Sequence, residues 1–556
     1  MCAVYIGIDV GTCSVRAMAV TENAQIIGCT EQQLLIHKPA ADYYEQSSEQ
    51  IWAACGGAVQ QLLREQHVSP DAVSGVGFDA TCSLVLLDEQ CRPVRLPCVS
   101  ATDADHSDGS AQCNVIMWMD HRAHAQAAQI NATGHSALTF VGNQISLEMQ
   151  PPKLLWLSQH HPALFERIAH CMDLVDFLTF KATNSLCRSQ CTVVCKWCCQ
   201  ADGETGAKWD DSFWEAISLS SLIFENHRRI GGRILLPGTK LENGLSAEAA
   251  RLFGLRAGTA VAAGLIDAHA GALALLASVT AMHAPSKQEC AAADACDCLC
   301  MIGGTSVCHL AVSRDRLFVP AVWGPYYGAL LPALWLNEAG QSAVGNCLDL
   351  LVKQQLNCED DHCMRKLRHV HVWPDYHGNR SPFANADYTA AVVGLTLNDM
   401  QSAHEQHQQL VAFERCDSTQ LPPVARLYLA HVHALAYMTR LIVETLHAHG
   451  HAFHLLALCG GLQHNELYVQ THADALQLSV CVFGECAQPV ALGAAMLAAC
   501  AASERASGSI LQTASALAQP MQFVRANPAV AHHHDAKYSM FRKLGQFVAQ
   551  TVADKK

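Results

Sequence analysis

The sequence has few charged residues and no apolar run long enough to cross a membrane. Charged side chains make up 15% of the 556 residues, and 36 Lys and Arg stand against 50 Asp and Glu, for a net charge of −14. A chain with this excess of negative charge is not attracted to nucleic acid or to anionic membrane surfaces. The most apolar stretch, 259–281, is interrupted by Asp267 and His269 and so lacks the ~18–20 uninterrupted apolar residues of a spanning helix. We therefore expect no nucleic-acid partner and no association with a membrane.

A basic leader and a small-residue cleavage site are also missing from the first residues, which run from Met1 directly into an apolar segment over 3–8. This predicts no secretory signal and a cytoplasmic location, where cysteines stay reduced. The 27 cysteines are therefore interpreted as small buried apolar residues. Several cysteines are closely spaced between Cys191 and Cys199, but no second Cys or His pair follows at the spacing of a zinc site. We expect neither a metal nor a disulfide there.

Two common nucleotide-binding motifs are absent or out of place. No Gly-x-x-x-x-Gly-Lys-Ser/Thr occurs, which excludes a Walker-type loop. Gly75-x-Gly77-x-x-Ala80 matches the dinucleotide fingerprint in letters, but that fingerprint must open a helix. Residues 83–87 instead form an apolar run of strand length, so we expect no Rossmann site.

Half of the residues are apolar, which is enough for large cores, and strand patterns alternate with helix patterns as in a layered α/β fold. We expect a three-strand meander over 4–36, a helix over 48–66 and a strand over 73–78. A strand, a Gly/Thr turn and a second strand recur over 298–312. The chain is therefore expected to contain two halves on one plan, whose turns face a shared cleft. The remaining expectations are a strand over 454–458 leading to a helix near Asn465, a terminal helix over 538–552, and loops over 100–114, 282–297 and 513–528.

The two Gly/Thr turns carry groups that suit a phosphate. The first contains Asp9, Gly11 and Thr12 and is followed by Ser14 and Arg16. Glycine lets backbone N–H groups approach phosphate oxygens, hydroxyls donate further bonds, and a carboxylate can hold hydrated Mg²⁺. An ordinary hairpin turn, in which Asp and Gly are also common, is the alternative for this turn alone. The second turn, over 303–306, favours the phosphate interpretation, because two donor-rich turns together can clamp one phosphate group.

Asp267 lies between small and apolar residues in the segment Gly264–Ala270. A carboxylate in such surroundings is either a cap at a helix start or a base with an adjusted pKa. The pattern alone favours the cap, and both interpretations stay open at this point.

Seven segments together resemble the FGGY family of carbohydrate kinases, two-domain ATP-dependent enzymes of the actin-like superfamily, nearly from end to end. They are Gly7-Ile8-Asp9-Val10-Gly11-Thr12, Trp118-Met119-Asp120-His121-Arg122-Ala123, Lys153-Leu154-Leu155-Trp156-Leu157, Gly264–Ala270, Gly303–Ser306, Asn337–Ala343 and Gly460–Asn465. The resemblance implies an α/β fold of two actin-like (ribonuclease H-like) ATPase domains with an active-site cleft between them. It implies an N-terminal domain over 1–278 and a C-terminal domain over 279–556.

The resemblance also implies roles for particular positions, and it replaces the cap interpretation of Asp267. Asp267 would be the base that takes the proton from the sugar hydroxyl, and Asp9 would hold Mg²⁺ through water. The implied ATP and phosphate residues are Gly11, Thr12, Ser14, Arg16, Gly304, Thr305, Gly460, Gly461 and Asn465. The implied sugar residues are Asp79, Thr81, Asp120, Lys196 and Glu338.

Residues 78–85 look like a stretch characteristic of the D-ribulokinase group of that family, and Trp323–Tyr327 and the Cys-Lys-Trp around Lys196 point the same way. The resemblance implies transfer of the γ-phosphoryl group of ATP to the terminal hydroxyl of D-ribulose. Another sugar kinase, acting on L-ribulose, D-xylulose or a polyol, is the nearest alternative, and an actin-like ATPase without a sugar substrate is a more distant one. The expected partners are the small-molecule sugar and ATP, with a homodimer left open.

Overall fold

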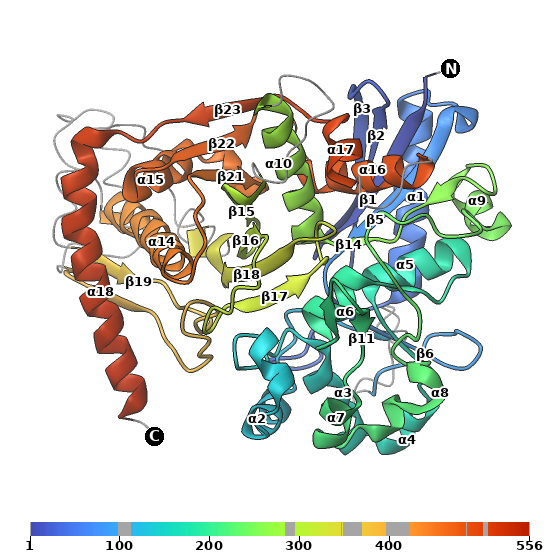
Figure 1. The fold of residues 1–556 in the computed structure, drawn as a ribbon, viewed down its shortest axis with the longest axis horizontal. Coiled ribbons are helices and arrows are strands. Elements are labelled where there is room, and N and C mark those ends of the chain that lie inside the picture. The colour runs from blue at the N-terminus through green and yellow to red at the C-terminus, as the bar shows by residue number, and fades with distance from the viewer. Residues whose placement is uncertain are drawn as a thin grey trace. The chain divides into compact units, whose positions relative to one another are not determined.

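The computed structural model of the chain describes residues 2–97, 113–283, 295–345, 347–348, 370–395, 423–484, 486, 488–503 and 510–554. The chain divides into two compact units (Figure 1). The first unit comprises Met1–Cys296, Leu310–Asn337 and Glu485–Pro520, and the second comprises Asp297–His309, Glu338–Gly484 and Met521–Lys556. The two consecutive domains expected on either side of residue 278 stay a prediction.

The central sheet of the first unit starts with the expected three-strand meander. Its strands are β1 (Val4–Val10), β2 (Ser14–Thr21), β3 (Ile26–Gln33), β5 (Val73–Ala80), β13 (Ala260–Val261) and β14 (Leu265–Ile266). β1, β2 and β3 pair antiparallel in chain order, whereas β5 pairs with β1 in parallel. Both β13 and β14 pair with β5 in parallel. The carboxyl ends of β1, β5 and β14 therefore lie at the same edge of the sheet.

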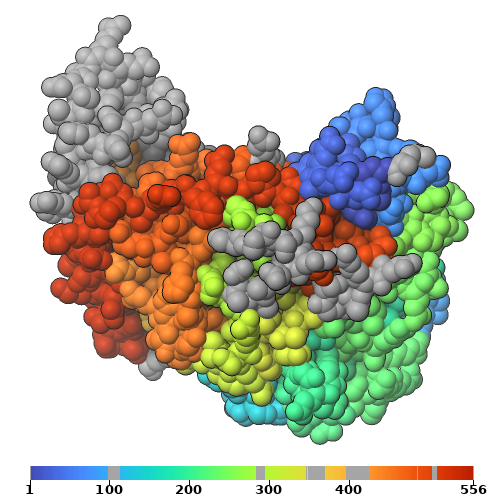
Figure 2. Space-filling model, turned by 45° about the horizontal axis from the view of Figure 1, so that its top comes forward, coloured from blue at the N-terminus to red at the C-terminus, as the bar shows by residue number. Residues whose placement is uncertain are grey.

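Helices from distant parts of the chain cover this sheet. α1 (Ser48–Glu65), predicted over 48–66, packs on β2 and β3 and begins where the Ser47 hydroxyl accepts the N–H of Gln50. α16 (Pro489–Ala502) packs on β1 and β5, although it lies almost at the other end of the sequence. It is red beside the blue strands in Figure 1, and red spheres also lie among the blue and green ones in Figure 2. α10 (Asp267–His283) and α17 (Ile510–Ser515) pack against α16.

Glycines allow α16 to approach the strands closely. A Cβ on Gly7 or on Gly77 would lie 2.0 Å from a carbonyl oxygen of α16, and one on Gly75 would lie 2.4 Å from another. The helix itself is rich in buried alanine, and its Gly493 makes the same close approach to the Ala270 carbonyl of α10. The helix backbone lies directly on the strands at these glycines, where there is no room for a side chain. α16 and the first strands therefore share one core.

A smaller sheet in the same unit has the order β4-β7-β6-β8. Its strands are β4 (Glu45–Gln46), β7 (Val115–Ile116), β6 (Leu84–Leu87) and β8 (His170–Asp173). As predicted, a strand and not a helix follows the glycines at 75–80. The other elements of this unit are η1 (Pro70–Ala72), α2 (His124–Ala132), η4 (Ser136–Phe140), α3 (Gln150–His160), α4 (Pro162–Arg167), α5 (Leu174–Thr183), β9 (Arg188–Ser189), α6 (Gln190–Lys196), β10 (Gln200–Asp202), β11 (Gly206–Lys208), α7 (Asp211–Ala216), η5 (Ser220–Leu222), α8 (Phe224–His227), β12 (Ile234–Leu235) and α9 (Ala247–Phe253).

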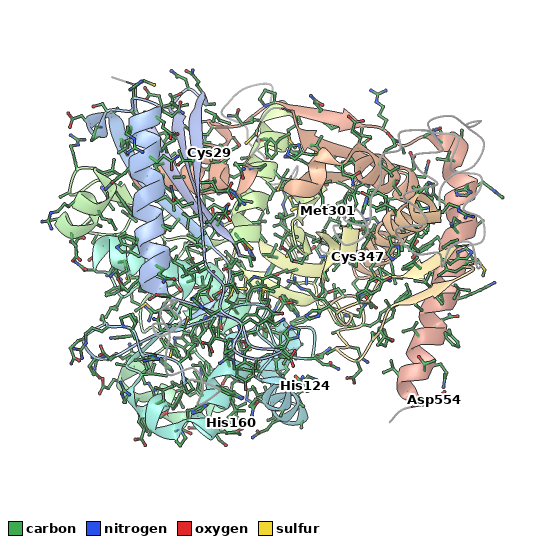
Figure 3. The ribbon with its side chains drawn as sticks, turned by 180° about the vertical axis from the view of Figure 1, so that it is seen from behind. Cys29, His124, His160, Met301, Cys347 and Asp554 are labelled. Carbon is green, nitrogen blue, oxygen red and sulfur yellow. The ribbon has the colours of Figure 1, made fainter. Side chains whose placement is uncertain are left out.

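The second sheet has the order β17-β18-β16-β15-β21-β22-β23. Its strands are β15 (Cys298–Gly303), β16 (Val307–Ser313), β17 (Trp323–Tyr327), β18 (Trp335–Gln341), β21 (Leu455–Cys459), β22 (Ser479–Phe483) and β23 (Met521–Val524). β15 and β16 form the second strand–turn–strand that the sequence predicts, and Met301 of β15, labelled in Figure 3, is buried. The chain passes from one unit to the other within β16 and β18.

The remaining elements belong to the second unit. They are β19 (His371–Trp373), β20 (Ala391–Val393), α14 (Pro423–Ala448), η8 (Gly461–His464), α15 (Glu466–Leu476), η10 (Pro528–Val530) and α18 (Ala531–Ala553). The predicted strand before Gly460 and the helix after Asn465 are β21 and α15, so this part of the sequence analysis is confirmed. The terminal helix is confirmed as well. It begins earlier than predicted, at Ala531, and its first turn was missed because three consecutive histidines show no apolar periodicity.

The predicted loop over 513–528 is wrong in part. α17 ends at Ser515, β23 occupies 521–524, and η10 begins at Pro528. β23 is a strand because it pairs antiparallel with β22. Its side chains are half-buried or exposed, so no alternation of apolar and polar residues announces it in the sequence. Of the other two predicted loops, residues 100–112 and 284–294 lie outside the described residues.

Candidate active site

Three carboxyl groups gather at the edge of the first sheet where β1, β5 and β14 end. Asp9 on β1 and Asp79 on β5 are register partners, and both are buried, at 2% and 0% exposed. Leu265 and Ile266 of β14 pair with Asp79 and Ala80. Asp267 follows directly as the first residue of α10. Sequence positions 9, 79 and 267 are thus brought together by parallel pairing of three strands.

Burial raises the pKa of two of these carboxyl groups, Asp9 and Asp79. The pKa of Asp79 is well above its ordinary value of 3.8, first because of burial and then because the negative charges of Asp9 and Asp267 are near. Burial also raises the pKa of Asp9, but Arg16 opposes this effect, since its Nη1 lies 3.0 Å from Oδ2 of Asp9. A protonated Asp79 can donate a hydrogen bond to Asp9. Two adjacent buried carboxyl groups can hold one shared proton in this way.

This pair fits a hard divalent cation. Carboxylate oxygens are the ligands that Mg²⁺ prefers, and no donor among the described residues reaches either oxygen of Asp79. A cation beside Asp9 and Asp79 would also relieve the repulsion that keeps the pKa of Asp79 high. Asp9, predicted to hold Mg²⁺ through water, is therefore in surroundings that suit this role.

Asp267 is half-buried at the N-terminus of α10, and its Oδ1 accepts the N–H of Ala268 at 2.7 Å. A helix starts at this residue, as one of the two interpretations of the sequence required, and the role of Asp267 as a base stays a prediction. The positive end of the helix dipole favours the ionised carboxylate, which is the form that a base requires.

The first turn, between β1 and β2, is held by bonds to its backbone and side chains. The N–H of Gly11 donates to the carbonyl of Ser14 at 3.0 Å. The hydroxyl of Thr12 accepts Nε1–H of Trp118 at 3.1 Å. Ser14 is buried, and Arg16 is committed to Asp9. The turn therefore links the predicted phosphate residues to the Trp118 segment and to the carboxylate pair.

Asp120 is part of a buried ion cluster. Its two oxygens accept Nε–H and Nη2–H of Arg122 at 2.9 and 2.8 Å, and the backbone N–H of Tyr44 donates to it at 2.7 Å. Arg122 also bonds Glu45 at 2.8 Å and stacks over the ring of Tyr43, 4.0 Å from its centroid. Asp120 thus orients Arg122, and its direct contact with a sugar stays a prediction.

Thr81 and Lys196 complete the predicted sugar residues of the first unit. Thr81 follows β5, and its hydroxyl lies 3.2 Å from that of Ser83. Lys196 is the last residue of α6 and is 2% exposed. Its ammonium lies 4.2 Å from the ring centroid of Trp323, a cation–π contact within one unit.

The second unit holds the other turn and the Gly460 segment next to each other. Gly460 has φ of +87°, and a Cβ there would lie 2.3 Å from the carbonyl oxygen of Gly303. Only glycine fits this position, because both the conformation and the close approach exclude a side chain. The space beside Gly304 and Gly461 is open, with no atom within 4 Å of a Cβ placed there. The backbone carbonyl of Thr305 accepts the backbone N–H of Gly345 at 3.1 Å.

Asn465 and Glu338 have defined partners in the same unit. Asn465 caps α15 by accepting the N–H of Tyr468 at 3.0 Å, and its Nδ2 donates to the Tyr428 hydroxyl at 2.8 Å. Glu338, on β18, forms an ion pair with Arg380 at 2.6 Å, with both side chains at most 6% exposed. The structure places the Gly303–Ser306 turn beside Gly460.

The sequence analysis gave Arg122 and Arg380 no role. Arg122 stands in a segment that carried the family resemblance, so its neighbour Asp120, two residues earlier, was a usable signal. Arg380 could not be found this way, because Glu338 is 42 residues away in the sequence.

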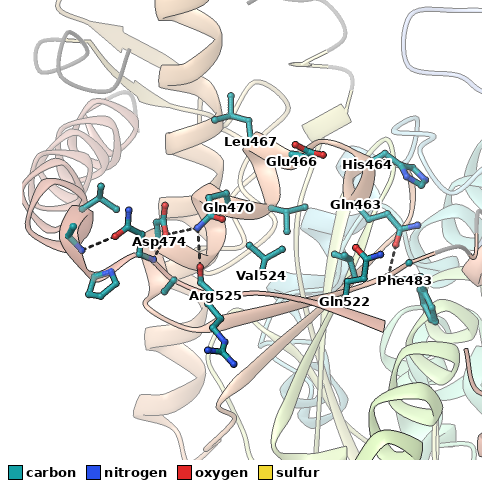
Figure 4. A pocket seen from close by; sticks show the side chains of 18 of the residues that line it. Gln463, His464, Glu466, Leu467, Gln470, Asp474, Phe483, Gln522, Val524 and Arg525 are labelled. Atoms are coloured by element: carbon teal, nitrogen blue, oxygen red, sulfur yellow. Dashed lines mark hydrogen bonds between the residues drawn. The ribbon is translucent and has the colours of Figure 1, made fainter. Parts of the chain in front are cut away.

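A groove of about 1460 Å³ opens in the second unit between α15, β22, β23 and η10 (Figure 4). Its walls are tied by their own polar groups: Gln470 donates to Asp474 at 2.8 Å, and the N–H of Asn527 donates to the same carboxylate at 2.7 Å. Gln463 and His464 line it, whereas the predicted nucleotide residues Gly460, Gly461 and Asn465 do not. The groove is therefore not part of the predicted site.

The sequence matches the N-terminal domain of the FGGY family of carbohydrate kinases over residues 4–274 and the C-terminal domain over residues 299–502. The chain belongs to the FGGY family of carbohydrate kinases. The resemblance found in the sequence, and with it the class of sugar kinase, is confirmed.

Curated relatives cover this FGGY kinase almost completely. FGGY carbohydrate kinase domain-containing proteins of Danio rerio and Homo sapiens are 41% and 40% identical to it; each alignment covers 99% of this chain, with 98% and 97% of the relative. A D-ribulokinase of Saccharomyces cerevisiae is 30% identical over 90% of this chain and 72% of its own length.

Solved structures show the same fold. A xylulose kinase from Rhodospirillum rubrum has a TM-score of 0.71 at 20% identity, covering 99% of both chains. Plasmodium falciparum glycerol kinase, solved with ADP, has a TM-score of 0.70 at 14% identity, covering 98% of both chains. The predicted fold class, α/β with two actin-like (ribonuclease H-like) domains, is confirmed. Within the part of the chain that the structure describes, no helix is both long and apolar enough to span a membrane.

Proposed function

We propose that this FGGY kinase transfers the γ-phosphoryl group of ATP to the terminal hydroxyl of D-ribulose, giving D-ribulose 5-phosphate and ADP. The observation that carries the proposal is the edge of the first sheet, where Asp267 begins α10 beside the buried pair Asp9 and Asp79. The relative of Saccharomyces cerevisiae named D-ribulokinase supports the choice of a pentulose. The resemblance of residues 78–85 to that group supports it further.

Asp267 would act as the base. Its carboxylate accepts the proton of the terminal hydroxyl as the hydroxyl oxygen bonds to the γ-phosphorus, and the bond from phosphorus to the β,γ-bridging oxygen breaks to leave ADP. The N-terminus of α10 would stabilise the negative charge of this carboxylate. A positioned base of this kind contributes typically ~10²–10⁴-fold in rate.

Asp9, with Asp79 beside it, would hold Mg²⁺ through water. When bound, the ion neutralises charge on the transferred phosphoryl group. Arg16, paired with Asp9 at 3.0 Å, fixes the direction of that carboxylate.

The two turns would bind the phosphates of one nucleotide. Gly11, Thr12, Ser14 and Arg16 supply backbone and side-chain donors in the first unit. In the second unit, Gly304 and Thr305 supply theirs, and the open space beside Gly304 leaves its backbone accessible to an oxygen. Gly460, Gly461 and Asn465 would border the adenosine.

The sugar would be bound by Asp79, Thr81, Asp120, Lys196 and Glu338. This set combines carboxyl, hydroxyl and ammonium groups, which match a polyhydroxylated substrate. In it, Asp120 would act together with Arg122, and Glu338 together with Arg380. A cytoplasmic location and a domain boundary after residue 278 remain part of the proposal, and a homodimer is left open.

The test is kcat/KM measured by coupled ADP release for D-ribulose, L-ribulose, D-xylulose and ribitol at equal Mg²⁺-ATP. The proposal predicts the highest value for D-ribulose. A higher value for another sugar would replace the substrate while keeping the site. ADP release that is equal with and without sugar would support an actin-like ATPase and overturn the proposal.

A further inference from the structure

Two buried cysteines and a histidine from a distant segment meet inside the first unit. Cys191 and Cys195 lie on α6, and His269 lies on α10; all three are 0% exposed. Their sulfur atoms and one ring nitrogen of the histidine lie within 4.8 Å of one another. The separation of Cys195 Sγ and His269 Nε2 is 3.6 Å.

The arrangement follows from the elements that carry it. Residues four apart share one face of a helix, so α6 presents both thiols in the same direction. α10 brings His269 to them from 74 residues further along the chain. The spacing of cysteines and histidines in the sequence does not predict a metal here, because His269 is far from the two cysteines in the sequence.

We propose that Cys191, Cys195 and His269 bind one Zn²⁺ ion. Zinc bonds of ~2.3 Å to sulfur and ~2.0–2.1 Å to nitrogen at a tetrahedral angle put the two ligand atoms about 3.5 Å apart. The observed 3.6 Å between Cys195 and His269 matches this value. All three ligand atoms lie within 4.8 Å of one another, so side-chain movements alone can bring them around one ion.

The charge and softness of the ligands select the ion. Two thiolates and a neutral imidazole balance the charge of a divalent ion, and a neutral complex avoids the cost of a buried charge. Thiolate sulfur is a poor ligand for Mg²⁺, so this site is separate in chemistry from the carboxylates of Asp9 and Asp79. Three protein ligands leave the fourth position of the ion open.

The site connects two helices of the proposed active site. α6 ends at Lys196, next to Cys195, and α10 begins at Asp267, two residues before His269. A bound ion would fix α6 against α10 and so fix the distance between Lys196 and Asp267. This consequence for catalysis rests on the proposed function, whereas metal binding does not.

Metal binding is tested on the purified full-length protein, stripped with a chelator and titrated with Zn²⁺. We expect one equivalent to remain bound after gel filtration and two protons to be released per ion, because both thiols bind as thiolates. Co²⁺ in place of Zn²⁺ should give a thiolate-to-cobalt charge-transfer absorption. Zn²⁺ should also raise the Tm of the stripped protein.

Variants separate this site from adventitious binding to the many other cysteines. C191S, C195S and H269Q should each lose the bound equivalent, the cobalt band and the rise in Tm. C55S removes an equally buried thiol from α1 and should keep all three. If the wild-type protein binds Zn²⁺ but does not phosphorylate a sugar, only the proposed function is overturned.

Two results would overturn the zinc site itself. One is a stripped wild-type protein that binds no Zn²⁺, which would leave a thiol–imidazole hydrogen bond between Cys195 and His269. The other is an equivalent that persists in the C191S/C195S double variant. Binding of Cu⁺ without Zn²⁺ would overturn the choice of ion.

Discussion

Asp79 lies beside Asp9 as its register partner on parallel strands, and its buried carboxyl group has a pKa well above 3.8. Asp9 is paired with Arg16, whereas no described donor reaches Asp79. The protein thus keeps a carboxyl group where its ionisation is unfavourable. Such a conflict is expected at a functional site rather than in a core.

The substitution D79N should stabilise the protein without ligands, and more so as the pH rises. The folded pKa of Asp79 is above the unfolded value of 3.8, so its contribution to stability is fully present below pH 3.8 and is lost as the pH rises through the folded pKa. Asparagine has no such loss. Denaturant unfolding of both proteins from pH 4 to 8 should show a difference that grows with pH. D315N, at an exposed aspartate, should show a constant difference. A D79N protein destabilised equally at both ends would contradict this account of Asp79.

The substitution D267N should lower kcat for sugar phosphorylation by ~10²–10⁴-fold, because the base is lost. Nucleotide binding, measured by calorimetry with Mg²⁺-ADP, should change little. D315N serves as the control and should keep wild-type kcat. Near-normal turnover by D267N would remove Asp267 from the proposed role.

Alanine at Gly304 should lower nucleotide affinity, whereas alanine at Gly460 should lower stability. G304A places a methyl group in open space, so Tm should stay within the error of measurement while affinity for Mg²⁺-ADP falls if phosphate oxygens approach this backbone. G460A should lower the free energy of unfolding by ~1–3 kcal/mol, since φ of +87° and the Gly303 carbonyl exclude a side chain. G461A, also in open space, is the stability control for G460A. Unchanged nucleotide affinity in G304A would argue against the second phosphate turn.

The sequence predicted the elements that local pattern determines. The two strand–turn–strand units, the strand before Gly460 and the helix after Asn465 all follow from short apolar runs and turn residues. β23 could not be predicted, because pairing with β22 makes it a strand while its own residues show no alternation. The closeness of α16 to β1 also depends on tertiary structure, although Gly7, Gly75 and Gly77 fit it.

The same division holds for the candidate site. Asp9, Asp79 and Asp267 were named from motifs, and parallel pairing brings them to one edge. Partners distant in sequence, such as Arg380 for Glu338 and His269 for Cys195, leave no mark that spacing can detect. The bonds of Asp120 to Arg122 lie within one motif, yet the motif does not tell an orienting carboxylate from a ligand-binding one.

The substitution R380Q should destabilise the second unit and raise KM for the sugar. It would leave Glu338 buried and without its ion-pair partner, and breaking a buried pair costs ~3–5 kcal/mol. R380K keeps a charge and should be milder. R228Q, which breaks exposed pairs with Glu89 and Glu225, should destabilise the protein much less than R380Q. If R380Q and R228Q destabilised the protein equally, Glu338 and Arg380 would not form a buried ion pair.

Acid should destabilise the protein partly through His534. Burial, followed by the nearby charges of His533 and Lys537, lowers the pKa of His534 from 6.5 to about 4, and its Nδ1 lies 3.0 Å from the Tyr437 hydroxyl. Its contribution to stability is present above pH 6.5 and is lost as the pH falls toward 4, because only the unfolded chain takes up the proton. Between pH 7 and pH 4, the unfolding free energy of wild type should therefore fall by ~3 kcal/mol more than that of H534Q. H124Q, at the exposed histidine labelled in Figure 3, should follow wild type.

The most direct test of the account is to identify the product formed from D-ribulose and Mg²⁺-ATP by phosphorus NMR and mass spectrometry. We predict D-ribulose 5-phosphate and ADP in equal amounts from the wild-type protein and at most a trace from D267N. ADP formed together with inorganic phosphate and no sugar phosphate would contradict the account.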